Sequence, residues 1–156
     1  MTAPTTPPVT IRPATPDDAQ TLVAFQLRMA HETEALHLDK DTVEKGVLAV
    51  FADPAKGRYY VAEKNGRLVG GTLVLPEWSD WRNGAVLWIH SVYVIPEARR
   101  GGVFTALYRH LREQVDRSPH LKGLRLYVDK SNAAAQHTYQ ALGMTSDHYQ
   151  LYEWLK

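Results

Sequence analysis

The chain has 156 residues, a formal net charge of +1 and no cysteine. With 44% hydrophobic and 22% charged residues, it has the composition of one soluble globular domain. The small net charge argues against a protein that binds nucleic acid or an anionic membrane surface, and the lack of cysteine excludes disulfides, cysteine metal ligands and a cysteine nucleophile.

The N-terminal segment, residues 1–8, is rich in threonine and proline. We predict that it is a disordered lead to a single domain over residues 9–156. It lacks the basic start and the apolar stretch of a signal peptide, and no run elsewhere approaches the ~20 apolar residues of a membrane span. We therefore expect a cytoplasmic protein.

The first half of the domain is predicted to place two helices between strands. Thr15 and Pro16 are typical of a helix start, as N-cap and first helical residue. Asn65-Gly66 favours a tight hairpin turn between two apolar stretches. The predicted elements are a strand over residues 9–14, a helix from Thr15 to about His31, a helix over 41–51, and strands over 59–63 and 68–75.

The second half alternates strands and helices. Its predicted elements are a loop over residues 77–84, a strand over 85–95, a helix from about Gly102 to Asp116, a strand over 124–128, a helix over 132–142 and a closing strand over 149–155. The strand, helix and strand of residues 85–128 make a right-handed crossover between parallel neighbours. With the earlier hairpin, the sheet is mixed, and the predicted class is α/β or α+β.

The connection between the strand over 85–95 and the helix after it has the features of an anion site. The apolar strand stops at Pro96, and Arg99-Arg100-Gly101-Gly102 leads into an amphipathic helix. This order brings free backbone N–H groups, two guanidinium charges and a helix N-terminus to one point, which favours a phosphate. The P-loop and dinucleotide-binding patterns are absent.

A second motif, NAAAQHTYQALGM, occupies residues 132–144. Together with R-R-G-G-V-F over residues 99–104, it resembles the GCN5-related N-acetyltransferase (GNAT) superfamily, and the resemblance covers nearly all of residues 9–155. It implies a mixed, mostly antiparallel twisted sheet flanked by helices, with a splayed parallel strand pair at the centre. Phe104 departs from the pattern, because the family has a small residue there. Its spacing with Tyr108 and Leu111 allows its ring to point into the core.

The resemblance implies acetyl-coenzyme A (acetyl-CoA) as cosubstrate. The pyrophosphate would lie on the turn, the pantetheine arm along Val92–Val94, and the acetyl carbonyl near the Val92 N–H group. Tyr139 would protonate the departing thiolate, or else be an aromatic side chain packed under its helix. Asn132 is an N-cap by its position and a cofactor contact by resemblance. The implied cofactor-binding residues are Val92, Tyr93, Val94, Arg99, Arg100, Gly101, Gly102, Val103, Phe104, Asn132 and Tyr139.

His90 is the candidate for the base that deprotonates the acceptor amine. Many family members carry a glutamate on the central strand, whereas Trp88-Ile89-His90-Ser91 has no acid. His90 lies nine residues before Arg99, where the arylalkylamine acetyltransferases also carry a histidine. A histidine titrates near neutral pH, which suits a base. A core histidine with satisfied hydrogen bonds is the alternative.

The acceptor is expected to be a primary amine of a small molecule, an amino acid or a protein. Candidate residues for its ammonium group are Glu32, Glu34 and Asp80, with Trp78 and Trp81 as walls. These acids are alternatively solvated surface residues, and the tryptophans alternatively part of a dimer surface. None of the seven histidines has convincing metal-site spacing with acids, so no metal is predicted.

Two other functions stay open at this point. A catalytically silent acyl-CoA-binding module would explain the missing strand glutamate. A nucleic-acid-binding protein would use Arg99, Arg100, Arg109 and Arg112, although the net charge argues against it. We expect neither nucleic acid nor a membrane as partner. A homodimer, with residues 149–154 as an edge strand, is left open.

Overall fold

The computed structural model describes residues 7–156, so most of the predicted N-terminal lead lies outside the described residues. The described chain forms two compact units, one that ends at Leu126 and one that begins at Tyr127.

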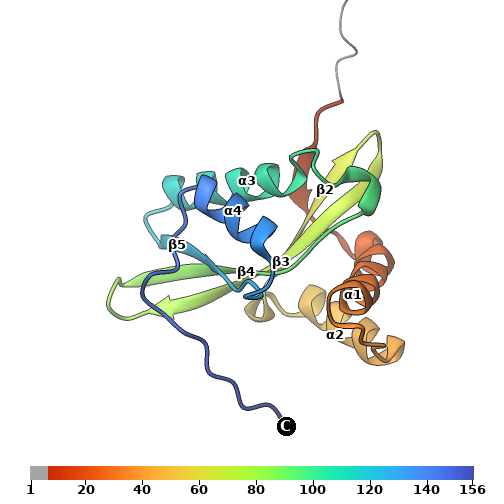
Figure 1. The fold of residues 1–156 in the computed structure, drawn as a ribbon, viewed down its shortest axis with the longest axis horizontal. Coiled ribbons are helices and arrows are strands. Elements are labelled where there is room, and N and C mark those ends of the chain that lie inside the picture. The colour runs from red at the N-terminus through yellow and green to blue at the C-terminus, as the bar shows by residue number, and fades with distance from the viewer. Residues whose placement is uncertain (1–6) are drawn as a thin grey trace, which may run out of the picture. The chain divides into compact units, whose positions relative to one another are not determined.

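The first unit is built on a mixed sheet of five strands in the order β1-β2-β3-β4-β5 (Figure 1). Three pairings are antiparallel, and β4 and β5 are parallel. The predicted mixed, mostly antiparallel sheet is therefore confirmed, although its parallel pair lies at one end of the described sheet and not at its centre. The strands are β1 (Thr10–Pro13), β2 (Arg58–Lys64), β3 (Arg67–Ser79), β4 (Gly84–Val94) and β5 (Leu121–Leu126).

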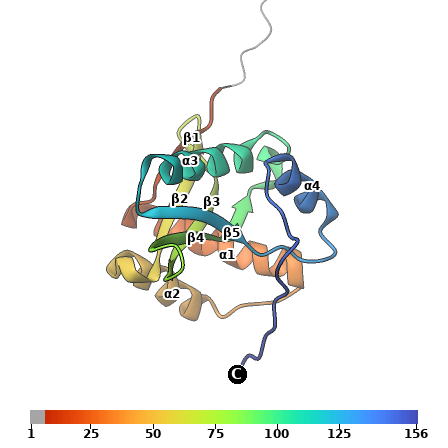
Figure 2. The same cartoon turned by 90° about the vertical axis from the view of Figure 1, so that its left-hand side faces the viewer.

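Helices cover both faces of this sheet. In Figures 1 and 2, α1 (Ala19–Glu34) and α2 (Lys40–Ala52) lie on one face, and α3 (Val103–Arg117) lies on the other. Two neighbouring glycines of β3 identify the faces: a side chain at Gly71 would meet Leu22 of α1, and one at Gly70 would meet Val103 of α3. Short 3-10 helices span Pro16–Asp18, Pro54–Lys56 and Pro96–Ala98.

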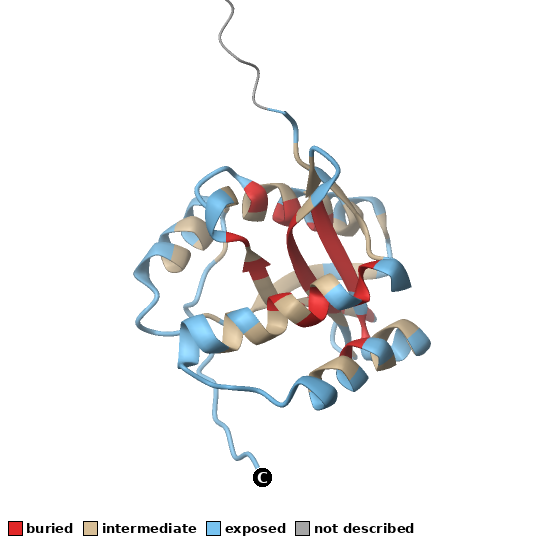
Figure 3. Cartoon of the chain, turned by 90° about the vertical axis from the view of Figure 1, so that its right-hand side faces the viewer, coloured by how far each residue is buried: buried red, intermediate tan, exposed pale blue. Residues whose placement is uncertain are grey.

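The core lies between these layers. Figure 3 shows buried residues on the central strands and on the sheet-facing sides of the helices. Leu22 of α1 and Leu107 and Leu111 of α3 are almost fully buried, as is Val61 of β2. Burial of such apolar side chains is the main favourable term in folding.

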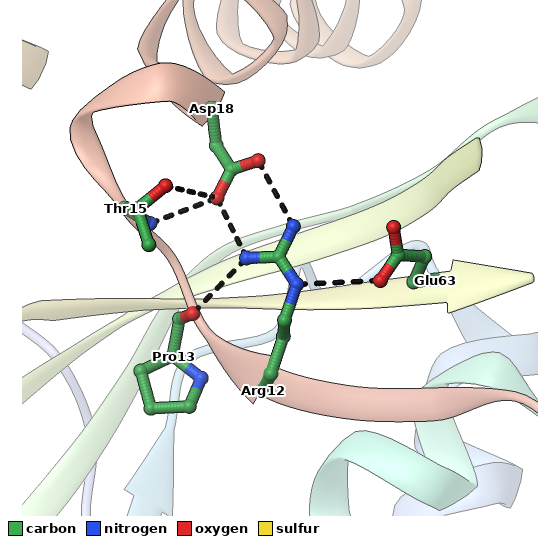
Figure 4. Close-up of polar contacts among 5 residues, drawn as sticks. All are labelled: Arg12, Pro13, Thr15, Asp18 and Glu63. Atoms are coloured by element: carbon green, nitrogen blue, oxygen red, sulfur yellow. Dashed lines mark hydrogen bonds and ion pairs between the residues drawn. The ribbon is translucent and has the colours of Figure 1, made fainter. Parts of the chain in front are cut away.

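A network of polar contacts connects the start of α1 with the edge of the sheet (Figure 4). The Arg12 guanidinium donates to both oxygens of Asp18, at 2.8 and 3.1 Å, and to Glu63 of β2 at 3.3 Å. The Thr15 N–H group also donates to Asp18, at 2.8 Å. Asp18 is buried, and its hydrogen bonds with Arg12 hold the pKa of its carboxyl below the usual value. This network therefore fixes the direction in which α1 leaves the sheet.

Two predicted elements of this unit differ from the structure. Strand β3 extends through Ser79, so the first part of the predicted loop over residues 77–84 is paired with β4. Strand β5 begins at Leu121 and ends at Leu126, earlier than the predicted 124–128. In both cases the strand bounds follow pairing with β4, which local composition does not reveal.

The second unit contains α4 (Ala133–Ala141). Asn132 is its N-cap, as predicted, because the Asn132 Oδ1 accepts a hydrogen bond from the Ala135 N–H group at 3.1 Å. The predicted closing strand over residues 149–155 is wrong: these residues form no regular element, and Tyr152 and Trp154 are exposed. Alternating apolar residues form a strand only where a neighbouring strand completes the backbone hydrogen bonds.

Candidate functional site

Strand β4 carries a bulge near its end. Gly71 of β3 pairs with Tyr93, and Leu73 pairs with His90. One residue of β3, Thr72, therefore lies opposite two residues of β4, Ser91 and Val92. Ser91 has a φ of 52°, a left-handed conformation that is unusual for a residue other than glycine. The Thr72 hydroxyl, which is buried, donates to the His90 carbonyl at 2.7 Å. Bulges and left-handed backbone conformations are frequent at functional sites.

The pairing of β4 with β5 ends just before this bulge. Their last recorded pair is Ile89 with Leu126, so residues 90–94 of β4 have no partner in β5. The unpaired backbone of an extended strand offers N–H and C=O groups to a ligand. On the other side of β4, Gly70 of β3 allows the two strands to approach closely. A Cβ atom at this position would lie 2.8 Å from the Tyr93 carbonyl oxygen.

The predicted phosphate turn follows directly. Arg100 has a φ of 63° and Gly102, the N-cap of α3, a φ of 77°. No side chain caps the helix, and its first backbone bond runs from the Ala106 N–H group to the Gly102 carbonyl. The preceding N–H groups of the first turn are therefore available to an anion. Gly102 is exposed, with open space where a Cβ would be, so the turn fits a phosphate.

The two arginines of the turn have different surroundings. Arg99 points toward α1, where its guanidinium donates to Glu32 and its Nε donates to the Val94 carbonyl at 2.9 Å. Arg100 is exposed, and within the described chain its side chain makes no hydrogen bond or ion pair. The Arg100 guanidinium can therefore bind a phosphate without the loss of an ion pair, whereas that of Arg99 cannot.

Glu32, Tyr93 and Arg99 form what we call the Tyr93 cluster. Besides accepting from Arg99, Glu32 accepts from the Tyr93 hydroxyl at 2.9 Å, and the Arg99 guanidinium lies 5.6 Å from the centre of the Tyr93 ring. The bond from Arg99 holds the pKa of Glu32 below its usual value, whereas burial and then the bond to Glu32 raise the pKa of Tyr93. One predicted substrate residue is thereby joined to two predicted cofactor residues.

A second cluster, which also contains a glutamate, an arginine and an aromatic residue, lies on the other side of His90. Trp88 of β4 is in register with Arg125 of β5, and the Arg125 guanidinium lies 5.9 Å from the centre of the Trp88 ring. The Glu77 carboxylate of β3 accepts from the Trp88 indole N–H group and, at 3.2 Å, from Arg125. Arg125 thus reaches across β4 from one neighbouring strand to the other. Glu77, Trp88 and Arg125 are called the Trp88 cluster.

His90 lies between the two clusters, on the sheet face that carries α1. It shares a face of β4 with Trp88, whose ring centre is 6.1 Å from that of His90. Tyr93 is opposite Gly71 and contacts Phe25 of α1, so it also faces that helix. Partial burial lowers the pKa of His90, which keeps the imidazole neutral near pH 7. A neutral imidazole is able to accept a proton.

The other predicted substrate residues are not brought to the bulge. Trp78 is opposite Ala85, six residues before Ser91, which corresponds to about 20 Å at ~3.3 Å per residue. Asp80 and Trp81 are in the adjoining turn, where Asp80 accepts from the Trp81 N–H group. Glu34 is exposed at the end of α1.

The remaining predicted cofactor residues occupy ordinary helical positions. Val103 is buried in the first turn of α3, and Phe104 packs along the same helix with its ring centre 6.4 Å from that of Tyr108. In the second unit, Tyr139 is half-buried on α4, and burial raises the pKa of its phenol. Tyr139 therefore keeps its proton at neutral pH.

Sequence reasoning missed four residues that shape the site: Gly70, Thr72, Glu77 and Arg125. The Gly70-Gly71 pair inside an apolar strand was the available signal, since glycine in a strand often marks a bulge or a close backbone approach. No local feature of the sequence indicates that Glu77 pairs with Arg125.

In the part of the chain that the structure describes, no group of three or more histidine, aspartate and glutamate side chains is placed to hold a metal ion. No helix within residues 7–156 is long and apolar enough to cross a membrane.

Comparison with known proteins points in one direction. The model of the acetyltransferase (GNAT) family matches residues 20–144. The mycothiol acetyltransferase of Streptomyces griseus is 31% identical over 153 residues, which cover 92% of this chain but 45% of that protein. This chain thus spans less than half the length of that relative.

Solved structures show the same similarity. A possible acetyltransferase from Clostridium difficile 630 superimposes with a TM-score of 0.88 at 41% identity, over 95% of this chain and 97% of that one. A predicted acetyltransferase from Clostridium acetobutylicum, solved with acetyl-CoA, has a TM-score of 0.72 at 16% identity, over 94% and 96% of the two chains. The second likeness concerns the fold alone.

Proposed function

This chain belongs to the acetyltransferase (GNAT) family, and we propose that it transfers the acetyl group of acetyl-CoA directly to a primary amine while both substrates are bound. The observation that carries the proposal is the bulge at Ser91, where β4 leaves β5 just before an uncapped helix N-terminus. A phosphate site and an open strand edge thereby follow each other within a few residues. A cytoplasmic location is part of the proposal.

The turn would hold the phosphates of acetyl-CoA. Arg100, Gly101 and Gly102 are exposed, and the N–H groups of Val103 and Phe104 belong to the first helical turn. Helix N-termini favour anions through these N–H groups and through the helix dipole. In this proposal Arg100 contacts a phosphate directly, whereas Arg99 stays with Glu32.

The unpaired end of β4 would bind the pantetheine arm along Val92–Val94 and offer the Val92 N–H group to the acetyl carbonyl. Such a donor stabilises the negative charge that develops on that oxygen. The amine nitrogen bonds to the acetyl carbon and the carbon–sulfur bond breaks. His90 takes the proton of the amine, and Tyr139 gives its proton to the departing thiolate.

The acceptor would approach from the face that carries α1. The phosphate turn opens α3 on the opposite face, and His90 is on the α1 side together with Tyr93. The likeness to mycothiol acetyltransferase supports acetyl transfer. In this proposal the acceptor is a primary amine of a small molecule, an amino acid or a protein.

A catalytically silent acyl-CoA-binding module is the second candidate. It is favoured by one observation: no carboxylate stands on β4 between Trp88 and Val94. The two functions differ in one measurable respect, because only the enzyme releases coenzyme A faster when an amine is added.

The first experiment is calorimetric titration with acetyl-CoA. We expect micromolar binding by the unmodified protein, loss of binding in Gly102→Glu, and weaker binding in Arg100→Ala. Gly66→Glu is a matched control, because Gly66 also has a left-handed φ, 71°, and open space around it, but lies in the β2–β3 turn. Equal binding by the Gly102 and Gly66 variants would contradict the phosphate turn.

The second experiment is coenzyme A release with a panel of primary amines. We expect amine-dependent release that falls in His90→Gln and in Tyr139→Phe, with acetyl-CoA binding retained in the His90 variant. Binding of acetyl-CoA without release for any amine would favour the silent module.

A further inference from the structure

Thr72 is the residue of β3 that lies opposite the bulge of β4. It is only 1% exposed, and its hydroxyl donates to the His90 carbonyl at 2.7 Å. The Leu73 carbonyl, another acceptor within reach, is 3.4 Å away, so the hydroxyl proton is directed to His90. At this burial no solvent competes for the hydrogen bond, and the bond therefore fixes the His90 carbonyl.

The Thr72 side chain is on the face of the sheet opposite to the His90 side chain. Gly71 is on the α1 face, so its neighbour Thr72 points toward α3. The partner of Thr72 on β2 is Tyr60, whose ring centre lies 5.6 Å from that of His110 of α3. Thr72 is therefore enclosed in the core, and any effect that it has on an acceptor at the α1 face must pass through the backbone of β4.

The bulge decides which side chains of β4 share a face. In a regular strand, residues three apart point to opposite faces, as His90 and Tyr93 would. Because two residues of β4 lie opposite Thr72, Tyr93 is opposite Gly71 and faces α1, as His90 does. Without the bulge, the proposed base and the ring of the Tyr93 cluster would be on different faces.

The bulge also relates the proposed base to the proposed donor for the acetyl oxygen. His90, Ser91 and Val92 are consecutive, and the φ of 52° at Ser91 sets where the imidazole lies relative to the Val92 N–H group. A left-handed conformation is costly for serine and persists only where the surrounding contacts hold it. The hydrogen bond from Thr72 to His90 is such a contact.

We propose that Thr72 is a positioning residue for acetyl transfer. By holding the His90 carbonyl, its hydroxyl sets the His90 imidazole and the Val92 N–H group in the arrangement that the reaction needs. The proposal rests on the acetyl-transfer function proposed above and adds a residue that touches neither substrate. A displacement of about 1 Å of groups that act on the reacting atoms is enough to lower a rate strongly.

The cofactor turn has anchors of its own, so a change at Thr72 should leave it in place. Beyond the bulge, the Ile95 N–H group donates to the Val69 carbonyl of β3 at 2.9 Å, and the Tyr93 hydroxyl donates to Glu32. We therefore expect loss of the Thr72 hydroxyl to lower kcat and to leave the Kd for acetyl-CoA nearly unchanged.

The test compares side chains at position 72 with and without a hydroxyl. Thr72→Val keeps the volume of the native side chain, Thr72→Ser keeps the hydroxyl without the methyl group, and Thr72→Ala lacks both. With a primary amine that the unmodified protein acetylates, we expect kcat to fall about tenfold in the valine and alanine variants and less than about threefold in the serine variant. The Kd for acetyl-CoA should stay within about twofold in all three. If Thr72→Val does not fold, the comparison of serine with alanine gives the same test.

Val61→Ala is the control for a loss of stability alone. Val61 is fully buried on β2, which does not pair with β4, and its truncation leaves a cavity in the core. It should lower the free energy of unfolding, measured by urea denaturation, without lowering kcat. A second readout needs no acceptor: in nitrogen–proton correlation spectra the amide signals of Ser91 and Val92 should move more in Thr72→Val than in Val61→Ala.

Three results would overturn the proposal: an unchanged kcat in Thr72→Val, a Thr72→Ser variant as slow as Thr72→Ala, or a loss of kcat in Val61→Ala equal to that in Thr72→Val. Failure of the underlying function looks different. In that case acetyl-CoA binds, but the unmodified protein acetylates no amine of the panel, and both proposals fall.

Discussion

The Tyr93 cluster and the Trp88 cluster each combine an arginine, a glutamate and an aromatic ring of β4, yet they are assembled differently. Glu32 and Arg99 are 67 residues apart, and their contact joins the last turn of α1 to the phosphate turn. Glu77, Trp88 and Arg125 instead lie on three adjacent strands, where the hydrogen bonds of the sheet fix their positions.

The different assembly of the two clusters predicts which substrate each substitution should affect. A change in the Tyr93 cluster acts on the turn that we propose for acetyl-CoA, because Arg99 belongs to that turn. A change in the Trp88 cluster acts only on the face beside His90. Single substitutions in and around the two clusters test this separation.

His90 is the residue that the two clusters share as a neighbour. In His90→Gln we expect kcat/KM to fall about 100-fold or more, with the Kd for acetyl-CoA unchanged. The pH profile gives a second test. Because burial lowers the pKa of His90, activity of the unmodified enzyme should fall only below about pH 6.5, as the imidazole takes up a proton.

The His90 variant should lose this acidic limb of the profile. If the variant keeps the limb, or if its main defect is a lower free energy of unfolding, His90 is a structural histidine and the two clusters do not frame a reaction centre.

Asp18 offers a reference cluster, since Arg12, Asp18 and Glu63 lie at the other edge of the sheet. Asp18→Asn should lower the free energy of unfolding by about 1–3 kcal/mol, because a buried carboxylate with several donors is lost. Acetyl-CoA binding should not change. Urea denaturation measures the effect, and Asp17→Asn, at an exposed neighbour, is the control.

The pH dependence of this difference has a defined sign. The pKa of Asp18 is lowered in the folded state, so its contribution is complete above the unfolded value of about 3.9 and disappears as the pH falls through the lower folded value. A difference between the unmodified protein and Asp18→Asn that stays constant as the pH falls from the unfolded value through the folded value would contradict this assignment.

Glu32→Gln and Glu77→Gln form a matched pair. Removing the negative charge of Glu32 beside Arg99 should tighten acetyl-CoA binding about threefold, because a nearby repulsion on the phosphates is lost. Glu77→Gln should leave that Kd unchanged and change only the KM of the acceptor amine. Titration and steady-state kinetics on both variants show whether the clusters are separate; identical effects on both substrates would show that they are not.

Trp81 should have the smallest effect. Its ring is 88% exposed in the β3–β4 turn, on the far side of Trp78 from the bulge. Trp81→Ala should change the acceptor KM less than about twofold, as is usual for a surface substitution. A large increase in KM would support the prediction from the sequence that Trp78, Asp80 and Trp81 bind the acceptor.

Much of the fold was predictable from the sequence, because the signals are local. The N-cap Asn132, the Asn65-Gly66 turn and the strand, turn and helix over residues 85–117 depend on contacts between residues close in the chain. The closing strand over 149–155 and the ends of β3 and β5 were not predictable in this way, since they depend on pairing between strands and not on local composition.

The phosphate turn at the start of an amphipathic helix and the family motif downstream of it could be recognised without a structure, since each consists of consecutive residues. The folded chain was needed to show that Arg99 binds Glu32 and not open solvent, that Thr72 holds a bulge at Ser91, and that Arg125 reaches Glu77 across Trp88. These contacts depend on strand register and on how α1 packs against the sheet, and neither is encoded in any short stretch of residues.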